Sequence, residues 1–204
     1  DVDKRESAKD EEADKVRILS GVFQGKTTGT PIALMIENSN QHSKDYSDIR
    51  DLARPSHADY TAQCKYHGYQ DYRGGGHFSG RITAAIVAAG AICLRALGRK
   101  GIVIGTHISS CAGIKDRDFE NLAEDISLLD GKDMPVLCSD AEKKMIEAIE
   151  QAKNDGDSLG GTLTTAVVGI PAGVGEPWFD TIEGVLAHAL FSIPAIQGVE
   201  FGSG

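Results

Sequence analysis

Residues 71–98 read DYRGGGHFSGRITAAIVAAGAICLRALG, and this stretch predicts a glycine-rich loop that leads directly into a helix. The loop contains three consecutive glycines at 74–76, which let the backbone turn tightly and approach a ligand closely. From Ile82 to Leu97 the residues are mostly alanine and aliphatic, and Gly98 is placed to end a helix. The loop residues are therefore expected at a helix N-terminus, where free backbone N–H groups favour an anion.

Strand and helix patterns occur on both sides of this stretch. Before it, Val16–Phe23 and Ile32–Glu37 are strand-like and flank a turn-rich link, which predicts a β-hairpin. After it, the sequence predicts strands at 102–108 and 162–170 and helices at 118–129, 140–153 and 180–191. This mixed order indicates an α+β fold or a layered α/β fold.

The last two predicted helices begin with the spacing of a capping box. Ser139 is followed three residues later by Glu142, and Asp180 is followed in the same way by Glu183. Each pair predicts a helix that begins just after the first residue of the pair.

The composition limits the classes of function. The chain has 204 residues and a net charge of −9, which disfavours a generic nucleic-acid binder because such proteins carry a basic face. The longest apolar segment, Ile82–Leu97, is interrupted by Gly90 and Arg95, so no membrane span is expected. No signal peptide is visible. The 4 cysteines form no C-x-x-C pair, and we expect reduced thiols in a cytoplasmic protein.

Positive charge is concentrated between Arg54 and Arg81. This window holds four Lys or Arg residues against two Asp residues, so it carries +2 within a chain of −9. Arg73 and Arg81 can each form two hydrogen bonds to a phosphate or carboxylate, and Ser79 can cap the helix or donate its hydroxyl to phosphate. The alternative is a loop that only packs a turn and leaves its arginines solvated.

A second group of polar residues lies at Arg54-Pro-Ser-His57-Ala-Asp59. His57 stands between an arginine and an aspartate, which makes it a candidate proton donor, although a lone histidine is more often structural. The other histidines are interpreted as background: His42, His67, His107 and His188. Of these, His188 is expected to be a satisfied histidine in the core.

The segment from Ser20 to Thr27 differs from a nucleotide-binding P-loop at one position, where Ser20 replaces glycine. A P-loop must open a helix, but Gly29 and Pro31 follow here and lead into a β-rich run. We therefore expect Lys26 in a hairpin and not at a phosphate.

Six segments of the chain resemble the chorismate synthase family, in the family's order. They are GKTTGTPI at 25–32, IENSNQHSKDYSDI at 36–49, RPSHADYT at 54–61, DYRGGGHFSGRITA at 71–84, GDSLGG at 156–161, and GEPWFD with SIPAIQGVEFG at 175–180 and 192–202. Together they span nearly all of residues 16–202.

The resemblance implies an α+β fold, a layered β-α-β sandwich of the chorismate synthase type. It implies a single domain over 1–204 that is incomplete at both ends, with 1–15 a poorly matched lead-in. It further implies a cytoplasmic homotetramer with a small-molecule substrate and with no nucleic-acid, membrane or metal partner.

The activity that the resemblance implies is 1,4-elimination of phosphate from 5-enolpyruvylshikimate 3-phosphate, which gives chorismate with reduced FMN and no net redox change. NADPH is implied only where the protein reduces its own flavin. By its place in the motif, His57 is expected to protonate the reduced flavin. The residues expected to bind the substrate are Arg54, Ser79 and Arg81, and those expected to contact the flavin are His77, Phe78 and Ser79.

The chain departs from the family pattern at several places. His77 and Phe78 stand where many members have Arg-Ser, and Gln197 stands where lysine is common. The family's N-terminal Gly-Glu-Ser-His-Gly segment, with its second catalytic histidine, and its C-terminal flavin-binding segments are not found in residues 1–204. The alternative hypothesis is a non-catalytic fragment that retains phosphate or FMN binding.

Overall fold

The computed structural model describes residues 14–38, 52–55, 57–72 and 76–202. Within these ranges the chain combines antiparallel strands with helices, which places it in the α+β class. Its contacts divide it into two compact units, the first around residues 93–174 and the second around the chain before Cys93 and after Val174.

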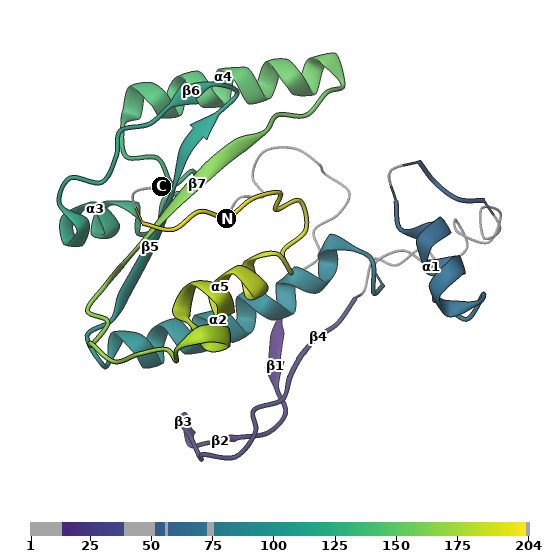
Figure 1. The fold of residues 1–204 in the computed structure, drawn as a ribbon, viewed down its shortest axis with the longest axis horizontal. Helices are drawn as coiled ribbons and strands as arrows, with labels where there is room; N and C mark the ends of the chain where they lie inside the picture. Colours follow the sequence, from purple (N-terminus) through teal and green to yellow (C-terminus); the bar gives the residue numbers. More distant parts are fainter. Residues whose placement is uncertain (1–13, 39–51, 56, 73–75, 203–204) are drawn as a thin grey trace. The chain divides into compact units, whose positions relative to one another are not determined.

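The first unit is built on a three-stranded antiparallel sheet with the order β6-β5-β7. Its long strands are β5 (Val103–Cys111) and β7 (Gly161–Val168), and β6 (Ile114–Lys115) pairs with the end of β5. The register runs from Val103 opposite Val168 to Cys111 opposite Gly161 (Figure 1). Both long strands lie where the sequence predicts them, in runs rich in β-branched residues.

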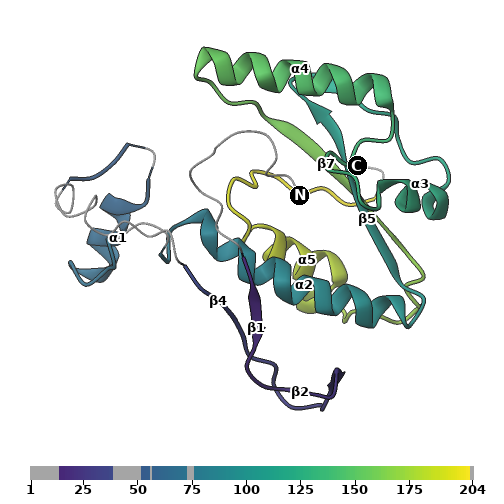
Figure 2. The same cartoon turned by 180° about the vertical axis from the view of Figure 1, so that it is seen from behind.

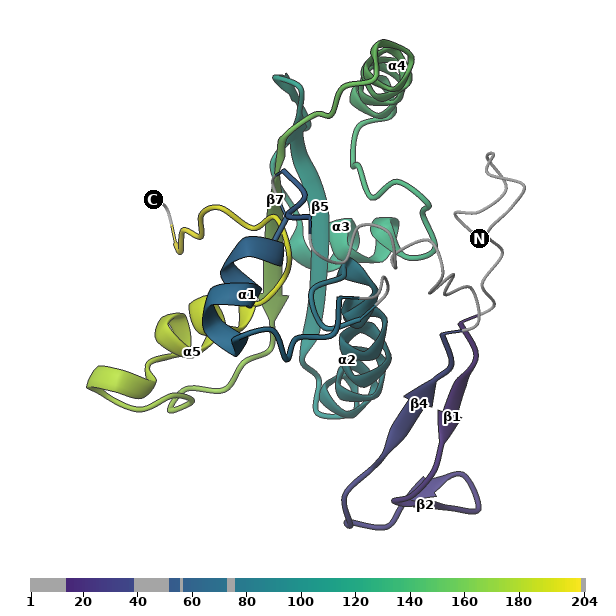
Figure 3. The ribbon, with the colours of Figure 1, turned by 90° about the vertical axis from the view of Figure 1, so that its right-hand side faces the viewer.

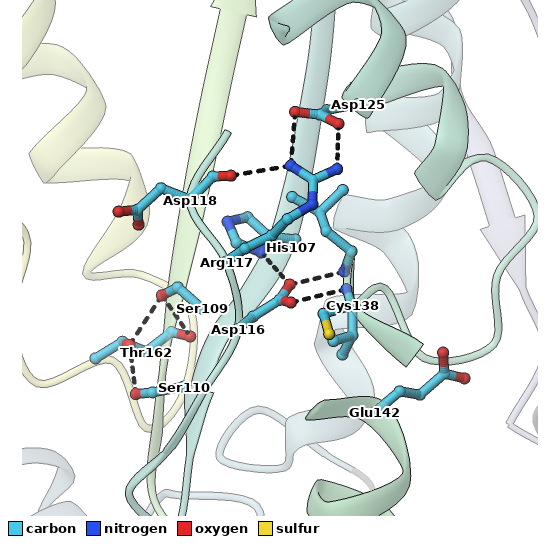
Figure 4. Close-up of polar contacts among 12 residues, drawn as sticks. His107, Ser109, Ser110, Asp116, Arg117, Asp118, Asp125, Cys138, Glu142 and Thr162 are labelled. Atoms are coloured by element: carbon cyan, nitrogen blue, oxygen red, sulfur yellow. Dashed lines mark hydrogen bonds and ion pairs between the residues drawn. The ribbon is translucent and has the colours of Figure 1, made fainter. Parts of the chain in front are cut away.

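A β-bulge interrupts the pairing of β5 with β7 between Ile108 and Ser110. Ser109 and Ser110 both lie opposite Thr162, whose Oγ1 is 2.9 Å from Ser109 Oγ and 2.7 Å from Ser110 Oγ. Ser109 Oγ also donates to the Thr162 carbonyl at 3.1 Å (Figure 4). Two residues on one strand thus face one residue on the other, as a bulge requires.

Two helices cover this sheet, α3 (Leu122–Leu129) and α4 (Ser139–Asp155). α3 contacts β5 and β7, and α4 contacts β6 (Figure 2). The core at α4 consists of buried residues Val136, Ala141 and Met145, packed against partly buried Ile108, Cys111, Ile114, Met134 and Cys138. α3 approaches β5 closely because Gly105 leaves room for the buried side chain of Ile126.

The carboxylate of Asp116 joins β5 to the start of α4, and its side chain is fully buried. Oδ2 lies 2.8 Å from His107 Nδ1 and accepts the Leu137 N–H at 2.7 Å, while Oδ1 accepts the Cys138 N–H at 2.9 Å (Figure 4). Burial alone would raise the pKa of Asp116, but these donors together lower it below its ordinary value. The group is therefore a carboxylate at neutral pH, and His107 Nδ1 must carry a proton to donate to it.

A second buried carboxylate fixes the start of α3. Asp125 accepts two hydrogen bonds from Arg117 and the backbone N–H groups of Glu120 and Asn121. The Arg117 hydrogen bonds hold the pKa of Asp125 well below its usual range. Asp125 is a residue of α3 itself, and it accepts the two backbone N–H groups that immediately precede the helix. The side chain of Asn121, at the cap position, forms no such hydrogen bond.

The second unit contains the predicted β-hairpin, which the structure confirms (Figure 3). β1 (Val16–Ile18) pairs with β4 (Leu34–Ile36), and farther along β2 (Val22–Phe23) pairs with β3 (Lys26–Thr27). Gln24 and Gly25 join β2 to β3 with φ of 48° and 72°, the positive values of a tight hairpin turn. Lys26 is a strand residue, so the segment is not a P-loop.

The helices of the second unit are α1 (Asp59–Tyr66), most of α2 (Thr83–Gly98) and α5 (Ile182–Leu190), with short 3-10 turns η3 (Gly80–Ile82) and η4 (Trp178–Asp180). α2 confirms the helix predicted for Ile82–Leu97. The stretch Gly80–Gly98 is long and apolar enough to cross a membrane by length and composition, with a mean hydropathy of 1.6. None of this stretch is buried within the structure, and a single helix of this kind is weak evidence of a membrane span.

Both predicted capping boxes are wrong. α4 begins at Ser139 after Cys138, whose side chain forms no cap. The cap of α5 is Thr181, which accepts the Gly184 N–H, while Asp180 belongs to η4. The Glu142 N–H donates to the Cys138 carbonyl and not to Ser139, and at α5 the neighbouring Thr181 takes the capping role that the pattern assigned to Asp180.

Two further expectations are corrected by the structure. Residues 59–66 form helix α1, although they lack a clear apolar period, and the sequence predicted no element there. His188 is exposed on α5 and is not a core histidine. The described thiols agree with expectation, since all four cysteines are free.

We predict that Gly105→Ala destabilises the protein by about 1–3 kcal/mol, because the added Cβ would lie 2.6 Å from Ile126 Cγ1. Gly90→Ala is the matched control, since its Cβ would meet nothing within 4 Å. The control should be neutral or stabilising by up to about 1 kcal/mol, because alanine is the better helix former. Urea unfolding measures both variants, and equal effects would contradict the proposed close approach.

We predict that Asp116→Asn lowers the free energy of unfolding by about 2 kcal/mol or more at pH 7, since the amide leaves at least one buried donor unpaired. A lowered pKa contributes stability that is present above the unfolded pKa, about 3.9, and is lost as pH falls through the folded pKa. The difference from wild type should therefore shrink in acid. Exposed Asp118→Asn is the control, expected within about 0.5 kcal/mol of wild type throughout. A difference that is independent of pH would contradict the charge effect.

Candidate functional site

The structure places the predicted site residues of the second unit before two helices. Arg54 and His57 precede α1, and the segment from His77 to Arg81 precedes α2. Ser56 and residues 73–75, with Arg73 and two of the loop glycines, lie outside the described residues. The predicted roles of these side chains stay predictions, whereas their neighbours can be described.

Asp59, the first residue of α1, brings Arg54 and His57 together. Its Oδ2 accepts from the Arg54 backbone N–H at 3.0 Å and from Arg54 Nε at 2.7 Å, and its Oδ1 accepts from Arg54 Nη2 at 2.9 Å. His57 Nδ1 lies 2.8 Å from the same Oδ1. One carboxylate therefore holds a bidentate arginine and a histidine.

This group is half-buried, with side-chain exposures of 34% for Arg54, 33% for His57 and 23% for Asp59. The Arg54 side chain, by its hydrogen bonds, holds the pKa of Asp59 well below its usual range, although burial opposes the shift. Asp59 is thus ionised at neutral pH. Its charge offsets that of Arg54 within this group.

Ser79 caps the turn that leads into α2. Its Oγ accepts the Arg81 backbone N–H at 3.1 Å, and the turn η3 continues into the helix. A hydroxyl that accepts at a cap still has its own O–H to donate, so capping is compatible with a contact to a phosphate. Of the two roles that the sequence left open for Ser79, the structure confirms the cap.

Arg81 extends from η3 to the hairpin. Nη1 forms an ion pair with Asp14 at 2.5 Å, and Nη2 donates to the Glu37 carbonyl at 3.2 Å. The Arg81 side chain is 21% exposed. A phosphorylated ligand that used this guanidinium would meet the Asp14 carboxylate there, which would have to move or give up its hydrogen bond.

An aromatic group connects α1 to the loop before α2. Phe78 lies edge-on to His77, with ring centroids 5.1 Å apart, and its centroid is 6.2 Å from that of Tyr66 on α1. Lys65 Nζ lies 5.6 Å from the Tyr66 centroid. These rings place an apolar, flat-sided surface beside the polar residues of the loop.

Sequence reasoning named Asp59 beside His57 without giving it a role of its own, and it missed Asp14, which lies in the lead-in at 1–15. The spacing of Asp59, two residues after His57 and five after Arg54, was the available signal. Asp14 offered none, since it pairs with a residue far along the chain.

The described side chains suit an anion and a flat aromatic ligand. They comprise two arginines, a histidine, a hydroxyl and three rings. No cluster suited to a metal ion occurs among the residues that the structure describes.

Comparison with known proteins identifies relatives of the whole chain. A family model described as chorismate synthase matches residues 2–204. The chain is 45% identical over 199 residues to chorismate synthase of Korarchaeum cryptofilum, covering 95% of this chain and 53% of that protein. It is 47% identical over 195 residues to chorismate synthase of Pyrococcus abyssi, with the same coverage of 95% and 53%.

A solved structure shares the fold. A crystal structure of chorismate synthase superposes with a TM-score of 0.73 at 32% identity, covering 92% of this chain and 54% of that one. This similarity confirms the predicted α+β fold of that type. The chain spans about half the length of the curated relatives it matches.

Proposed function

The chain belongs to the chorismate synthase family, and on that basis we propose that its protein converts 5-enolpyruvylshikimate 3-phosphate to chorismate by 1,4-elimination of phosphate. The observation that carries this proposal is that Asp59 holds Arg54 and His57 together before α1, while Ser79 and Arg81 lie at the turn before α2, in a chain of net charge −9. An acidic chain can bind a phosphorylated, carboxylated substrate only where cations are locally concentrated.

The arginines are assigned to the substrate's anionic groups. Arg81 and Arg54 offer planar guanidinium groups, which match phosphate and carboxylate with two parallel hydrogen bonds. Ser79 adds a hydroxyl donor at the start of η3, where it already caps the chain. Asp14 holds Arg81 by an ion pair. In the proposed complex the substrate takes over this guanidinium from Asp14.

His57 is assigned as a proton donor. Its Nδ1 lies 2.8 Å from Asp59 Oδ1, which engages that nitrogen and leaves Nε2 as the one that can give a proton to a ligand. The His57 side chain is 33% exposed, so a ligand can approach it. A proton donor that is supported on one nitrogen and accessible on the other is suited to repeated transfer.

The described residues fit a reduced flavin as cofactor. Phe78 with Tyr66 and His77 forms a ring surface on which a flat isoalloxazine can pack, and Ser79 follows with a hydrogen-bonding group. Reduced FMN would supply electron density that helps the phosphate leave, without net redox change. His77, Phe78 and Ser79 are the residues of this chain assigned to hold it. We further propose a cytoplasmic homotetramer, with NADPH used only if the protein reduces its own flavin.

The test is an anaerobic assay of the full-length protein with chemically reduced FMN and 5-enolpyruvylshikimate 3-phosphate. We expect one chorismate and one phosphate per substrate consumed, with no net oxidation of the flavin. Phosphate release without chorismate, or no reaction in a folded protein, would show that the proposal is wrong.

We predict that His57→Ala lowers kcat by about 10²-fold or more, the usual effect of losing a positioned acid, while substrate affinity changes far less. The measurement is steady-state turnover with anaerobically reduced FMN, which removes any flavin reductase step from the assay. His188→Ala is the control, because His188 is exposed on α5 and belongs to neither group of site residues. Near-normal turnover of His57→Ala would remove the assigned role.

We predict that Arg81→Lys weakens substrate binding by about tenfold or more, since a charged hydrogen bond contributes about 1.5–3 kcal/mol and lysine cannot reproduce the planar fork. Calorimetric titration with 5-enolpyruvylshikimate 3-phosphate measures the loss. Arg99→Lys, at an exposed turn after α2, is the matched control and should bind like wild type. Equal affinities of Arg81→Lys and wild type would exclude Arg81 as a substrate ligand.

A further inference from the structure

His57 Nδ1 has two neighbours that make opposite demands on it. Asp59 Oδ1 lies 2.8 Å away and, as an ionised carboxylate oxygen, can only accept a hydrogen bond. Arg54 Nη2 lies 3.0 Å away and can only donate one. A ring nitrogen that carries a proton satisfies the carboxylate, and one that carries a lone pair satisfies the guanidinium. Nδ1 can do only one of these.

The positions of the atoms decide in favour of the carboxylate. Arg54 Nη2 lies 3.0 Å from Nδ1 and 3.4 Å from Nε2, so it is almost equidistant from the two ring nitrogens. Their lone pairs point away from each other in the ring plane, and an atom this close to both must lie against the face of the ring. Nη2 also already donates to Asp59 Oδ1 at 2.9 Å. The guanidinium is thus a stacking neighbour of His57 and not its hydrogen-bond donor.

The Asp59 carboxylate is itself firmly placed. Arg54 contributes its backbone N–H and its Nε to Oδ2, so the carboxylate cannot rotate without breaking both hydrogen bonds. Asp59 also opens helix α1, which fixes its backbone. Oδ1 is therefore presented to Nδ1 in one orientation.

We propose that Asp59 is a positioning residue that keeps His57 protonated at Nδ1 and directs Nε2 toward the reacting molecule. This inference rests on the proposed function, in which His57 transfers a proton. Asp59 touches neither substrate nor cofactor in this scheme. It acts on proton transfer, and so on kcat, through His57, whereas its hydrogen bonds to Arg54 bear on substrate affinity. The same carboxylate also keeps the Arg54 guanidinium against the ring, so one group sets the orientation of two assigned site residues.

The variant Asp59→Asn separates position from charge. An amide whose oxygen takes the place of Oδ2 retains the two Arg54 hydrogen bonds to that atom and loses only the one that Nη2 donates to Oδ1. Its NH₂ group then replaces Oδ1 opposite His57. Because NH₂ only donates, it requires a lone pair on Nδ1 and moves the ring proton to Nε2. In wild type, an imidazolium that gives its Nε2 proton to the reacting molecule becomes a neutral ring that keeps the Nδ1 proton on the carboxylate. A neutral ring with its only proton on Nε2 could donate it only by becoming an imidazolate, so proton transfer should be impaired.

The first experiment is a double-mutant cycle in the full-length protein with reduced FMN and 5-enolpyruvylshikimate 3-phosphate. We expect Asp59→Asn to lower kcat by about tenfold or more, as for other residues that orient a catalytic histidine. In a His57→Ala background the same change should alter kcat by less than about threefold, because Asp59 acts through a ring that is no longer there. Equal factors in both backgrounds would overturn the proposal.

The second experiment observes the ring without turnover. Nitrogen NMR of the full-length protein, labelled at histidine and assigned with His57→Gln, distinguishes a protonated ring nitrogen from a bare one. We expect a protonated Nδ1 in the neutral ring of wild type and a protonated Nε2 in Asp59→Asn. Asp125→Asn, which changes another arginine-paired aspartate, is the control for general loss of stability and should leave the His57 signals and kcat unchanged. The same ring form in wild type and Asp59→Asn would overturn the proposal.

The two inferences fail in different ways. A folded wild-type protein that makes no chorismate would overturn the proposed function and with it the catalytic role of Asp59. An active wild type whose Asp59→Asn and His57→Ala effects multiply would overturn only the positioning role.

Discussion

The buried carboxylate of Asp116 is the interaction on which the first unit depends. It collects one side-chain and two backbone N–H groups from segments that are far apart along the chain, His107 on β5 and Leu137 and Cys138 before α4. A buried charge without these donors would cost several kcal/mol. The folded unit therefore needs all three donors in contact with the carboxylate. The position where α4 begins is therefore set by the sheet and not by the helix's own residues.

The pair of Asp59 with His57 repeats the same chemistry in a different setting. Both aspartates lie 2.8 Å from the Nδ1 of a histidine, and other N–H donors lower the pKa of each carboxyl. His107 is fully buried, contacts Phe119 edge-on, and its Nε2 has no hydrogen-bond partner among the described residues. His57 is one-third exposed, so its second nitrogen can reach a ligand. Solvent access, not the pairing itself, separates a structural histidine from a candidate proton donor.

The sequence predicted those features that short-range patterns determine. The hairpin follows from two apolar runs around a glycine-rich link, and α2 follows from a run rich in alanine and aliphatic residues. The site motifs were found because their residues are close together in the chain. The features that the sequence could not predict depend on partners that are distant along the chain. Asp116 accepts a hydrogen bond from the backbone N–H of Cys138, which is 22 residues away. Arg81 donates one to the carbonyl of Glu37, which is 44 residues away. Helix α1 was missed because its residues show almost no apolar face, and polar contacts at Asp59 fix its start.

The bulge at Ser109 determines which side chains of β5 meet the core. In a regular strand, residues 108 and 111 would point to opposite faces, because neighbouring side chains alternate. The extra residue shifts the alternation by one place, and Ile108 and Cys111 accordingly pack together against Met145. The strand thus contacts two partners in succession, α3 at Gly105 and the core beside α4 at Ile108 and Cys111. Among relatives, the bulge at residues 108–110 should tolerate substitution far better than deletion. Loss of one residue here would place every later side chain of the strand on the opposite face of the sheet.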